Sequence, residues 1–156
     1  MANEQLKITN RARLWGLIVL GMSQGIWEMV EESASSLTPM IGAWVLQEAE
    51  KQLGLEIAGE KAEDVLTELA RIFVDEFGYA VESKVERADK TISISFKNAV
   101  GTPEFSRLIQ SGMDKLFFHP YMCAGLAALA RMGVKARWEV TLDAATSGQM
   151  VTFELL

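Results

Sequence analysis

The residues best suited to chemistry are His119 and Cys123, the only histidine and the only cysteine of this chain. They are four residues apart, so on a helix they would lie on the same face. An imidazole nitrogen and a thiolate sulfur both bind zinc, but a structural zinc ion needs four ligands. We treat the pair as weak metal candidates that would need carboxylates from elsewhere. The alternative is that Cys123 packs in the core and His119 is hydrogen-bonded at a helix end.

The sequence gives little support for catalysis. A Cys-His or Ser-His-Asp unit would have to use His119, and neither a nucleophile elbow nor a glycine-rich phosphate loop accompanies it. The acidic groups at 28–32 and 60–64 are typical of solvated helix ends and of charges that complement a helix dipole. We therefore favour a protein that is not an enzyme, with an enzyme as the last of the alternatives, and we expect no cofactor.

The helix that positions His119 and Cys123 is predicted from about Lys115 to Met132, and Gly133 ends it. Alternating apolar and polar side chains predict two β-hairpins, over 81–97 and 138–155, with turns near 88–89 and 145–148. A short helix is expected over 105–109. In both hairpins the alternation predicts one face in the core.

Three more helices are predicted before the first hairpin, over 14–30, 39–53 and 60–77. Turn and capping residues separate the first two, and Gly54 and Gly59 separate the last two. The order of elements favours a single α+β domain over residues 1–156, in which an antiparallel four-stranded sheet of two hairpins is covered on one face by helices. The alternative is an all-helical domain with two peripheral hairpins.

The first of these helices is unusually apolar, because Leu14 to Trp27 contains no charged residue. Fourteen residues rise only about 21 Å as a helix, which is short of the roughly 30 Å hydrocarbon core of a membrane. We therefore expect no membrane span. Gly21 and Gly25 would let a neighbouring helix approach closely. We expect a homodimer through the Leu14–Val30 helix, and ordinary packing within the chain is the alternative.

The C-terminal third resembles a known family. The placing of Cys123, Gly125, Gly133, Gly148 and Phe153 is similar to the 4-vinyl reductase (hydrocarbon-binding) domain of the nitric-oxide-signalling and Golgi-transport ligand-binding superfamily. The resemblance implies a fold that binds small molecules, with relatives among the subunits of the TRAPP vesicle-tethering complex. The order of helices and strands is similar over most of the chain, whereas the residue motif itself covers about forty residues.

The sequence departs from that family where the metal would bind. Many family members bind zinc with two cysteines of the final hairpin, and Ala144 and Thr152 stand at those positions here. We therefore expect the family zinc site to be absent. Haem sensors of the superfamily add a Tyr-x-Ser-x-Arg run, and neither Tyr79 nor Tyr121 begins one. We expect no haem.

The resemblance and the aromatic content together predict binding of a small hydrophobic molecule, as a sensor or carrier. Such pockets are mostly apolar with a few polar groups. The candidate ligand-binding residues are those expected where the second helix, the main helix and the sheet meet: Trp44, Phe118, His119, Tyr121, Met122, Cys123 and Trp138. One alternative is an ordinary filled core. The other is a scaffold subunit resembling TRAPP components, which assembles through its N-terminal helix.

Composition narrows the class of protein further. Hydrophobic residues make up 49 % and charged residues 23 % of the 156 residues, as in ordinary globular domains. The formal net charge of -6 disfavours docking on nucleic acid, which rewards a basic surface. The polar first residues carry no secretory signal pattern, so we expect a cytoplasmic protein.

Overall fold

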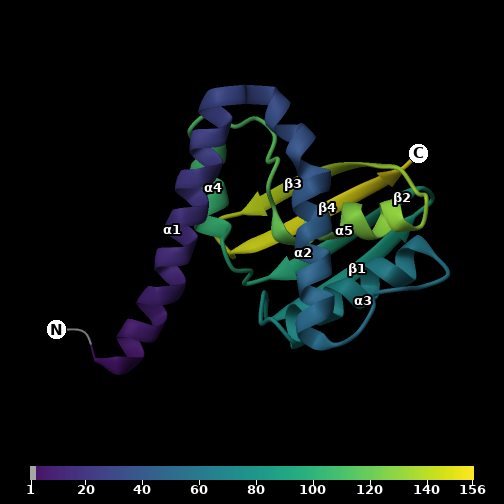
Figure 1. Ribbon diagram of the computed structural model, residues 1–156, viewed down its shortest axis with the longest axis horizontal. Helices are drawn as coiled ribbons and strands as arrows, with labels where there is room; N and C mark the ends of the chain where they lie inside the picture. Colours follow the sequence, from purple (N-terminus) through teal and green to yellow (C-terminus); the bar gives the residue numbers. More distant parts are fainter. Residues whose placement is uncertain (1–2) are drawn as a thin grey trace.

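The computed structural model describes residues 3–156, and it has the α+β architecture expected from the sequence (Figure 1). Two hairpins supply the strands, β1 Glu82–Ala88 with β2 Thr91–Lys97, and β3 Ala136–Asp143 with β4 Gly148–Leu155. All pairings are antiparallel, and the strand order is β1-β2-β4-β3. The two hairpins therefore join through β2 and β4, with β1 and β3 at the edges.

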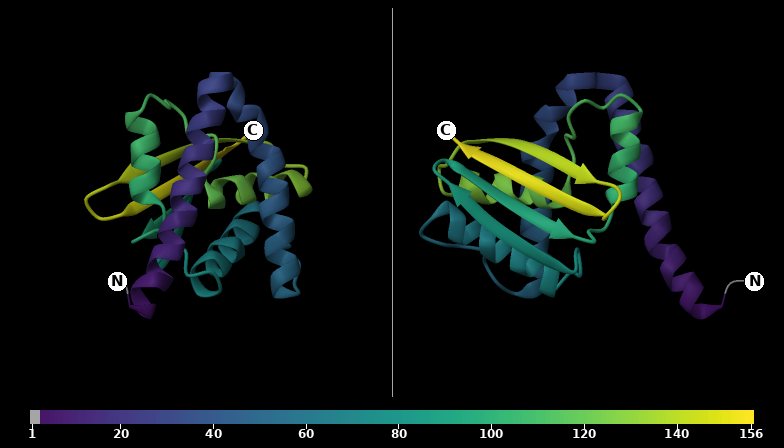
Figure 2. Two further views of the ribbon diagram at one scale, coloured as in Figure 1. Left: turned by 60° about the vertical axis from the view of Figure 1, so that its left-hand side comes forward. Right: turned by 180° about the vertical axis from the view of Figure 1, so that it is seen from behind.

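Helices cover one face of this sheet. They are α2 Thr38–Leu53, α3 Ala62–Asp75, α4 Thr102–Gln110 and α5 Pro120–Arg131, and the other face is open when the molecule is seen from behind (Figure 2). The strand burial follows this division, because Ile92, Ile94 and Phe96 are buried while their neighbours in β2 are partly or fully exposed. Period-two alternation thus correctly predicted the core face of both hairpins.

The main helix starts later than the sequence pattern predicts. It was expected from about Lys115, but α5 begins at Pro120. The imidazole of His119 caps the helix by accepting a hydrogen bond from the Met122 N–H, and the fixed φ of Pro120 suits the first helical position. The apolar run from Leu116 to Phe118 is an irregular segment, not helix. Its apolar side chains are spaced like those of a buried helix face, which is why the sequence pattern predicts helix there.

The N-terminal helix is longer than expected. Instead of starting near Leu14, α1 runs from Glu4 to Val30, and a 3-10 segment, η1 Glu31–Leu37, connects it to α2. The side chain of Asn3 caps it by accepting a hydrogen bond from the Leu6 N–H at 2.9 Å. None of the helices within residues 3–156 is long and apolar enough to cross a membrane.

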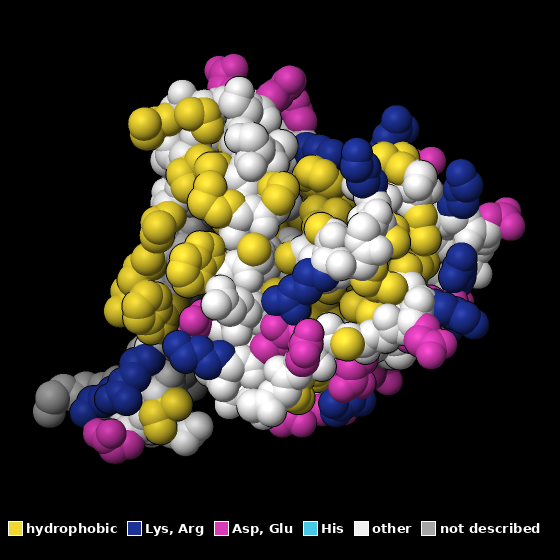
Figure 3. All heavy atoms as spheres, turned by 45° about the vertical axis from the view of Figure 1, so that its right-hand side comes forward, with side chains coloured by type: hydrophobic (Ala, Val, Ile, Leu, Met, Phe, Trp, Pro, Cys, Tyr) yellow, Lys and Arg dark blue, Asp and Glu magenta, His cyan; other side chains and the backbone are white. Residues whose placement is uncertain are grey.

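Two hydrophobic clusters hold the molecule together. The main cluster lies between the sheet and helices α2, α3 and α5. The second is built on α4 and the segment after it, and the inner side of the C-terminal half of α1 packs against it. The N-terminal half of α1 projects away from both clusters, and every residue from Asn3 to Trp15 is exposed (Figures 1 and 3).

Candidate functional site

His119 lies at the centre of a buried polar network, not in an open site. Its Nδ1 accepts the hydrogen bond from the Met122 N–H at 3.2 Å, so the ring proton must be on Nε2. That N–H donates to Oε1 of Gln149 at 2.8 Å, and the Tyr79 hydroxyl donates to the same oxygen at 2.5 Å. The amide nitrogen of Gln149 donates to Thr102 Oγ1 at 2.7 Å.

This network is satisfied within the protein, which fits a structural role. The Thr102 hydroxyl in turn donates a hydrogen bond to the carbonyl of Ala99 at 3.0 Å. Burial lowers the pKa of His119 to about 4, because a charged imidazolium would lose its hydration, and Gln149 offsets this only in part. Burial likewise raises the pKa of Tyr79. The ring of His119 is therefore neutral near pH 7, and its two nitrogens are already engaged.

Cys123 does not join His119 in a metal site. Its Sγ points to the carbonyl of Phe117 at 3.7 Å, and burial raises the pKa of the thiol to about 11. Metal ligation and nucleophilic attack both require the thiolate. Among residues 3–156 no group of three or more His, Cys, Asp or Glu side chains is arranged to hold a metal ion.

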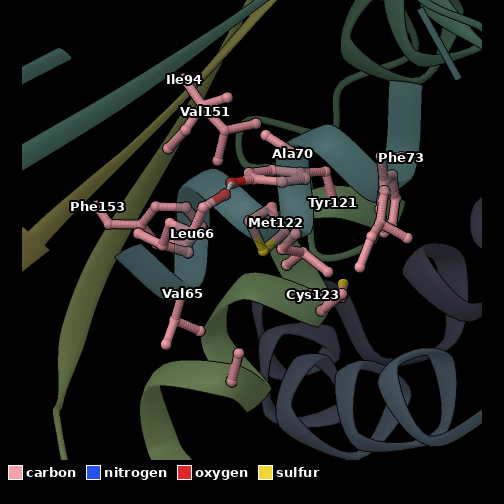
Figure 4. Packing of buried hydrophobic residues seen from close by; sticks show 14 of the residues in the cluster. Val65, Leu66, Ala70, Phe73, Ile94, Tyr121, Met122, Cys123, Val151 and Phe153 are labelled. Atoms are coloured by element: carbon pink, nitrogen blue, oxygen red, sulfur yellow. Dashed lines mark hydrogen bonds between the residues drawn. The ribbon is translucent and has the colours of Figure 1, made fainter. Parts of the chain in front are cut away.

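Tyr121 and Met122 are fully buried members of the main cluster (Figure 4). The Tyr121 ring packs edge-to-face on Phe73 and Phe96, with centroid distances of 5.4 and 4.8 Å. Its hydroxyl donates to the carbonyl of Leu66 at 2.7 Å. The surroundings of these two predicted ligand-binding residues are thus other core side chains.

Trp44 is not where the sequence analysis expected it. The expected junction of helices and sheet is formed by Gly42, Leu46 and Ala49, which are buried, while Trp44 is 62 % exposed. The reason is the close approach of α2 to α5 at Gly42, which fixes the rotation of α2. A residue two positions further along is about 200° around the helix and points to solvent.

The remaining predicted residues lie at the margins of the core. Trp138 is half-buried on the edge strand β3, where the Lys115 ammonium lies 3.9 Å from the ring centroid. Its indole nitrogen is buried and has no hydrogen-bond partner among the described residues. Phe118 is half-buried between the two clusters. The structure therefore buries His119, Tyr121, Met122 and Cys123 and leaves Phe118 and Trp138 packed at the edge of the main cluster. Of the predicted residues, Trp44 is the one that lies apart from this cluster.

Phe118 also lines an apolar groove that was not predicted from the sequence. This α1–α2 groove has a volume of about 300 Å³, and its lining comes from α1, the start of α2 and the segment before α5: Val19, Met22, Ser23, Ile26, Leu37, Met40, Ile41, Phe117 and Phe118. Ser23 is the single side chain with a hydroxyl in that lining. The groove can hold an apolar group but offers little for polar recognition.

Beside the groove, the outer side of α1 carries a row of exposed apolar residues. We call Trp15, Ile18, Met22, Gly25 and Met29 the α1 stripe, since their spacing alternates between three and four residues. Trp15, Met22 and Met29 are 68, 63 and 84 % exposed. A three-four spacing sustained over fifteen residues is the pattern of a helix seam that packs on another helix. The same spacing is present in the sequence, but apolar residues on the other sides of α1 make it hard to recognise there.

Comparison with known proteins gives no independent assignment. No family model and no curated protein matches this chain. The resemblance to the 4-vinyl reductase domain therefore stays a prediction.

Proposed function

We propose that this chain is an assembly subunit that forms a homodimer through α1. The observation that carries this proposal is the concentration of apolar surface on one helix. Among the described residues, ten of the nineteen exposed large hydrophobic side chains belong to α1: Leu6, Ile8, Leu14, Trp15, Leu17, Ile18, Val19, Met22, Met29 and Val30. Contiguous exposed apolar patches beyond roughly 600 Å² are unusual on monomers and mark interaction sites.

The placing of α1 also supports assembly over ordinary packing. A helix that is apolar all around is normally buried on every side. Here the inner side of its C-terminal half packs on the second cluster through Leu20, Ile26 and Trp27, while the outer side faces solvent. A second copy of the chain would cover that outer side without altering the fold of either protomer.

The test is the mass of the protein in solution across a concentration series, measured by sedimentation equilibrium. We expect a dimer at micromolar concentration. Ile18→Glu and Met22→Glu each place a charge on the α1 stripe and should give monomers, because a buried unpaired carboxylate is costly. Val81→Glu is the matched control for Met22→Glu, since Val81 is about as exposed as Met22 but lies far from α1 in the chain. A monomeric unmodified protein at 100 μM would refute the proposal.

A second candidate function is binding of a small hydrophobic molecule in the α1–α2 groove. The nearly uniform apolar lining favours it, and Phe118 is the one predicted ligand-binding residue that takes part. Native mass spectrometry of the purified protein tests this candidate. An added non-covalent mass of a few hundred daltons per chain, lost in Ile41→Trp, would support it. Absence of that mass after incubation with hydrophobic probes such as long-chain alcohols would count against it.

A further inference from the structure

We propose that two copies of α1 pair antiparallel, so that Trp15 of each copy packs on Gly25 of the other. This inference rests on the proposed homodimer and specifies its geometry. It is drawn from three features of the described chain: the spacing of the α1 stripe, the distribution of charge along α1, and the open space at Gly25.

Charge determines the relative direction of the two helices. The N-terminal part of α1 carries Lys7, Arg11 and Arg13 against one acidic residue, Glu4, and so has a net positive charge. The other end is acidic, with Glu28 and the following Glu31 and Glu32. Figure 3 shows mainly Lys and Arg side chains, with one acidic group, near the N-terminal tip, acidic side chains at the far end, and hydrophobic side chains between them. Parallel pairing would bring like charges together. Antiparallel pairing brings each basic end to the acidic end of the other copy.

Side-chain size determines the register. In a two-fold symmetric antiparallel pair, contacting residues have numbers with a constant sum. When the two-fold axis passes beside residue 20, the sum is 40. Trp15 of one copy then faces Gly25 of the other, Ile18 faces Met22, and Arg11 faces Met29. The largest side chain of the α1 stripe then meets the residue without a side chain. A shift of one heptad either way would set Trp15 against Ile18 or against Glu32, and would move the charged ends apart.

The space at Gly25 is available in the protomer. A Cβ added at Gly25 would meet no heavy atom of the described residues within 4 Å. In knobs-into-holes packing, four residues of one helix form the hole for one side chain of the other. Met22, Gly25, Ile26 and Met29 form such a set, and Met22 and Ile26 also line the α1–α2 groove. Trp15 of the second copy would therefore border the groove.

The extent of the pairing suits a stable dimer. An axis at residue 20 overlaps residues 10–30, which is about 30 Å of helix. Standard interfaces bury roughly 800 Å² on each partner. Over this length α1 presents Trp15, Ile18, Met22 and Met29 with large exposed fractions, flanked by Leu14 and Val19. A second copy is the occupant whose surface complements this one in both charge and size.

Disulfide trapping tests the direction. Arg11→Cys and Met29→Cys are prepared as separate proteins, one of them carrying an affinity tag, and are mixed and oxidised. The buried Cys123 serves as an unreactive background in the unmodified chain. We expect the mixed disulfide between positions 11 and 29 to dominate. Dominant 11–11 and 29–29 disulfides would show parallel pairing and overturn the inference while leaving the homodimer intact, whereas a monomer throughout would overturn both.

A double-mutant cycle tests the register. Gly25→Leu should weaken dimerisation at least about tenfold, because the new side chain competes with Trp15 for one space. Combining it with Trp15→Ala should restore much of the lost affinity. Lys51→Leu is the control, since it adds an exposed leucine to α2, outside α1, and it should change the dissociation constant by less than about threefold. Additive losses at Gly25 and Trp15 would overturn the register.

Discussion

Gly42 of α2 lies directly against the backbone of Cys123 in α5. A Cβ built at position 42 would overlap the carbonyl oxygen of Cys123 and lie 2.6 Å from its carbonyl carbon. Both neighbours are helix backbone, which cannot move aside as a flexible side chain does. This contact fixes the rotation of α2, so it buries Leu46 and leaves Trp44 exposed.

Gly42→Ala should therefore destabilise the protein although alanine favours helix. Overpacking of a tight core contact costs roughly 1–3 kcal/mol, and here it outweighs the gain of about 1 kcal/mol from the better helix former. Urea unfolding followed by circular dichroism measures the free energy of unfolding. Gly21→Ala, where a Cβ meets no described atom within 4 Å, is the control and should be neutral or stabilising. Equal stability of the two variants would contradict the contact.

Acid should weaken the fold through His119. The imidazole has a pKa of about 4 in the folded protein against a usual value of 6.5, so between these pH values the unfolded chain binds the additional proton. The free energy of unfolding should therefore fall as the pH drops from 6.5 to 4, by roughly 3 kcal/mol, with no contribution from this group above pH 6.5.

The matched variant for this pH dependence is His119→Asn, because asparagine can still cap α5. Chemical denaturation at several pH values should show a smaller slope between pH 4 and 6.5 in this variant. Burial opposes ionisation of Glu50, but hydrogen bonds from Arg131 and the Ile57 N–H outweigh it and lower its pKa. The stability that Glu50 provides is therefore lost at lower pH, and equally in both proteins. An unchanged slope would show that His119 does not titrate as expected.

The thiol of Cys123 should be nearly unreactive in the folded protein. A pKa of about 11, against 9.0 for the ordinary thiol, lowers the thiolate fraction at pH 8 about a hundredfold, and burial hinders access further. The rate of reaction with an aromatic disulfide reagent should therefore be at least about a hundred times slower than in denaturant. Rapid labelling without unfolding would instead indicate an accessible thiol.

Truncation of aromatic residues should distinguish surface from core. Trp44→Ala should change the free energy of unfolding of the protomer by less than about 1 kcal/mol, because the side chain is mostly in water. Phe117→Ala should cost about 3–5 kcal/mol, since Phe117 is fully buried in the second cluster. Thermal or urea denaturation of both variants provides the comparison. A large loss at Trp44 at protein concentrations where the dimer is dissociated would contradict its exposed position.

The sequence by itself determined the elements whose signals are local. Alternation at Ile92, Ile94 and Phe96 predicted a strand with one buried face, and paired periodicities predicted the α+β class with helices on one side. These predictions were confirmed because strand and helix periods depend only on backbone geometry. The start of α5 was wrong by about five residues, since the burial of Leu116 and Phe117 imitates a helical apolar face.

Only the tertiary structure decided which apolar residues are buried and which face solvent. Composition alone does not tell that Trp44 is exposed and Leu46 buried. The contact between Gly42 and Cys123 decides it, and these residues are eighty-one positions apart in the chain. The same holds for His119, whose partners Tyr79 and Gln149 come from distant segments, and for the α1 stripe, which is exposed because the second cluster covers only the inner side of α1. Such relations depend on long-range packing, which the local pattern of a sequence does not record.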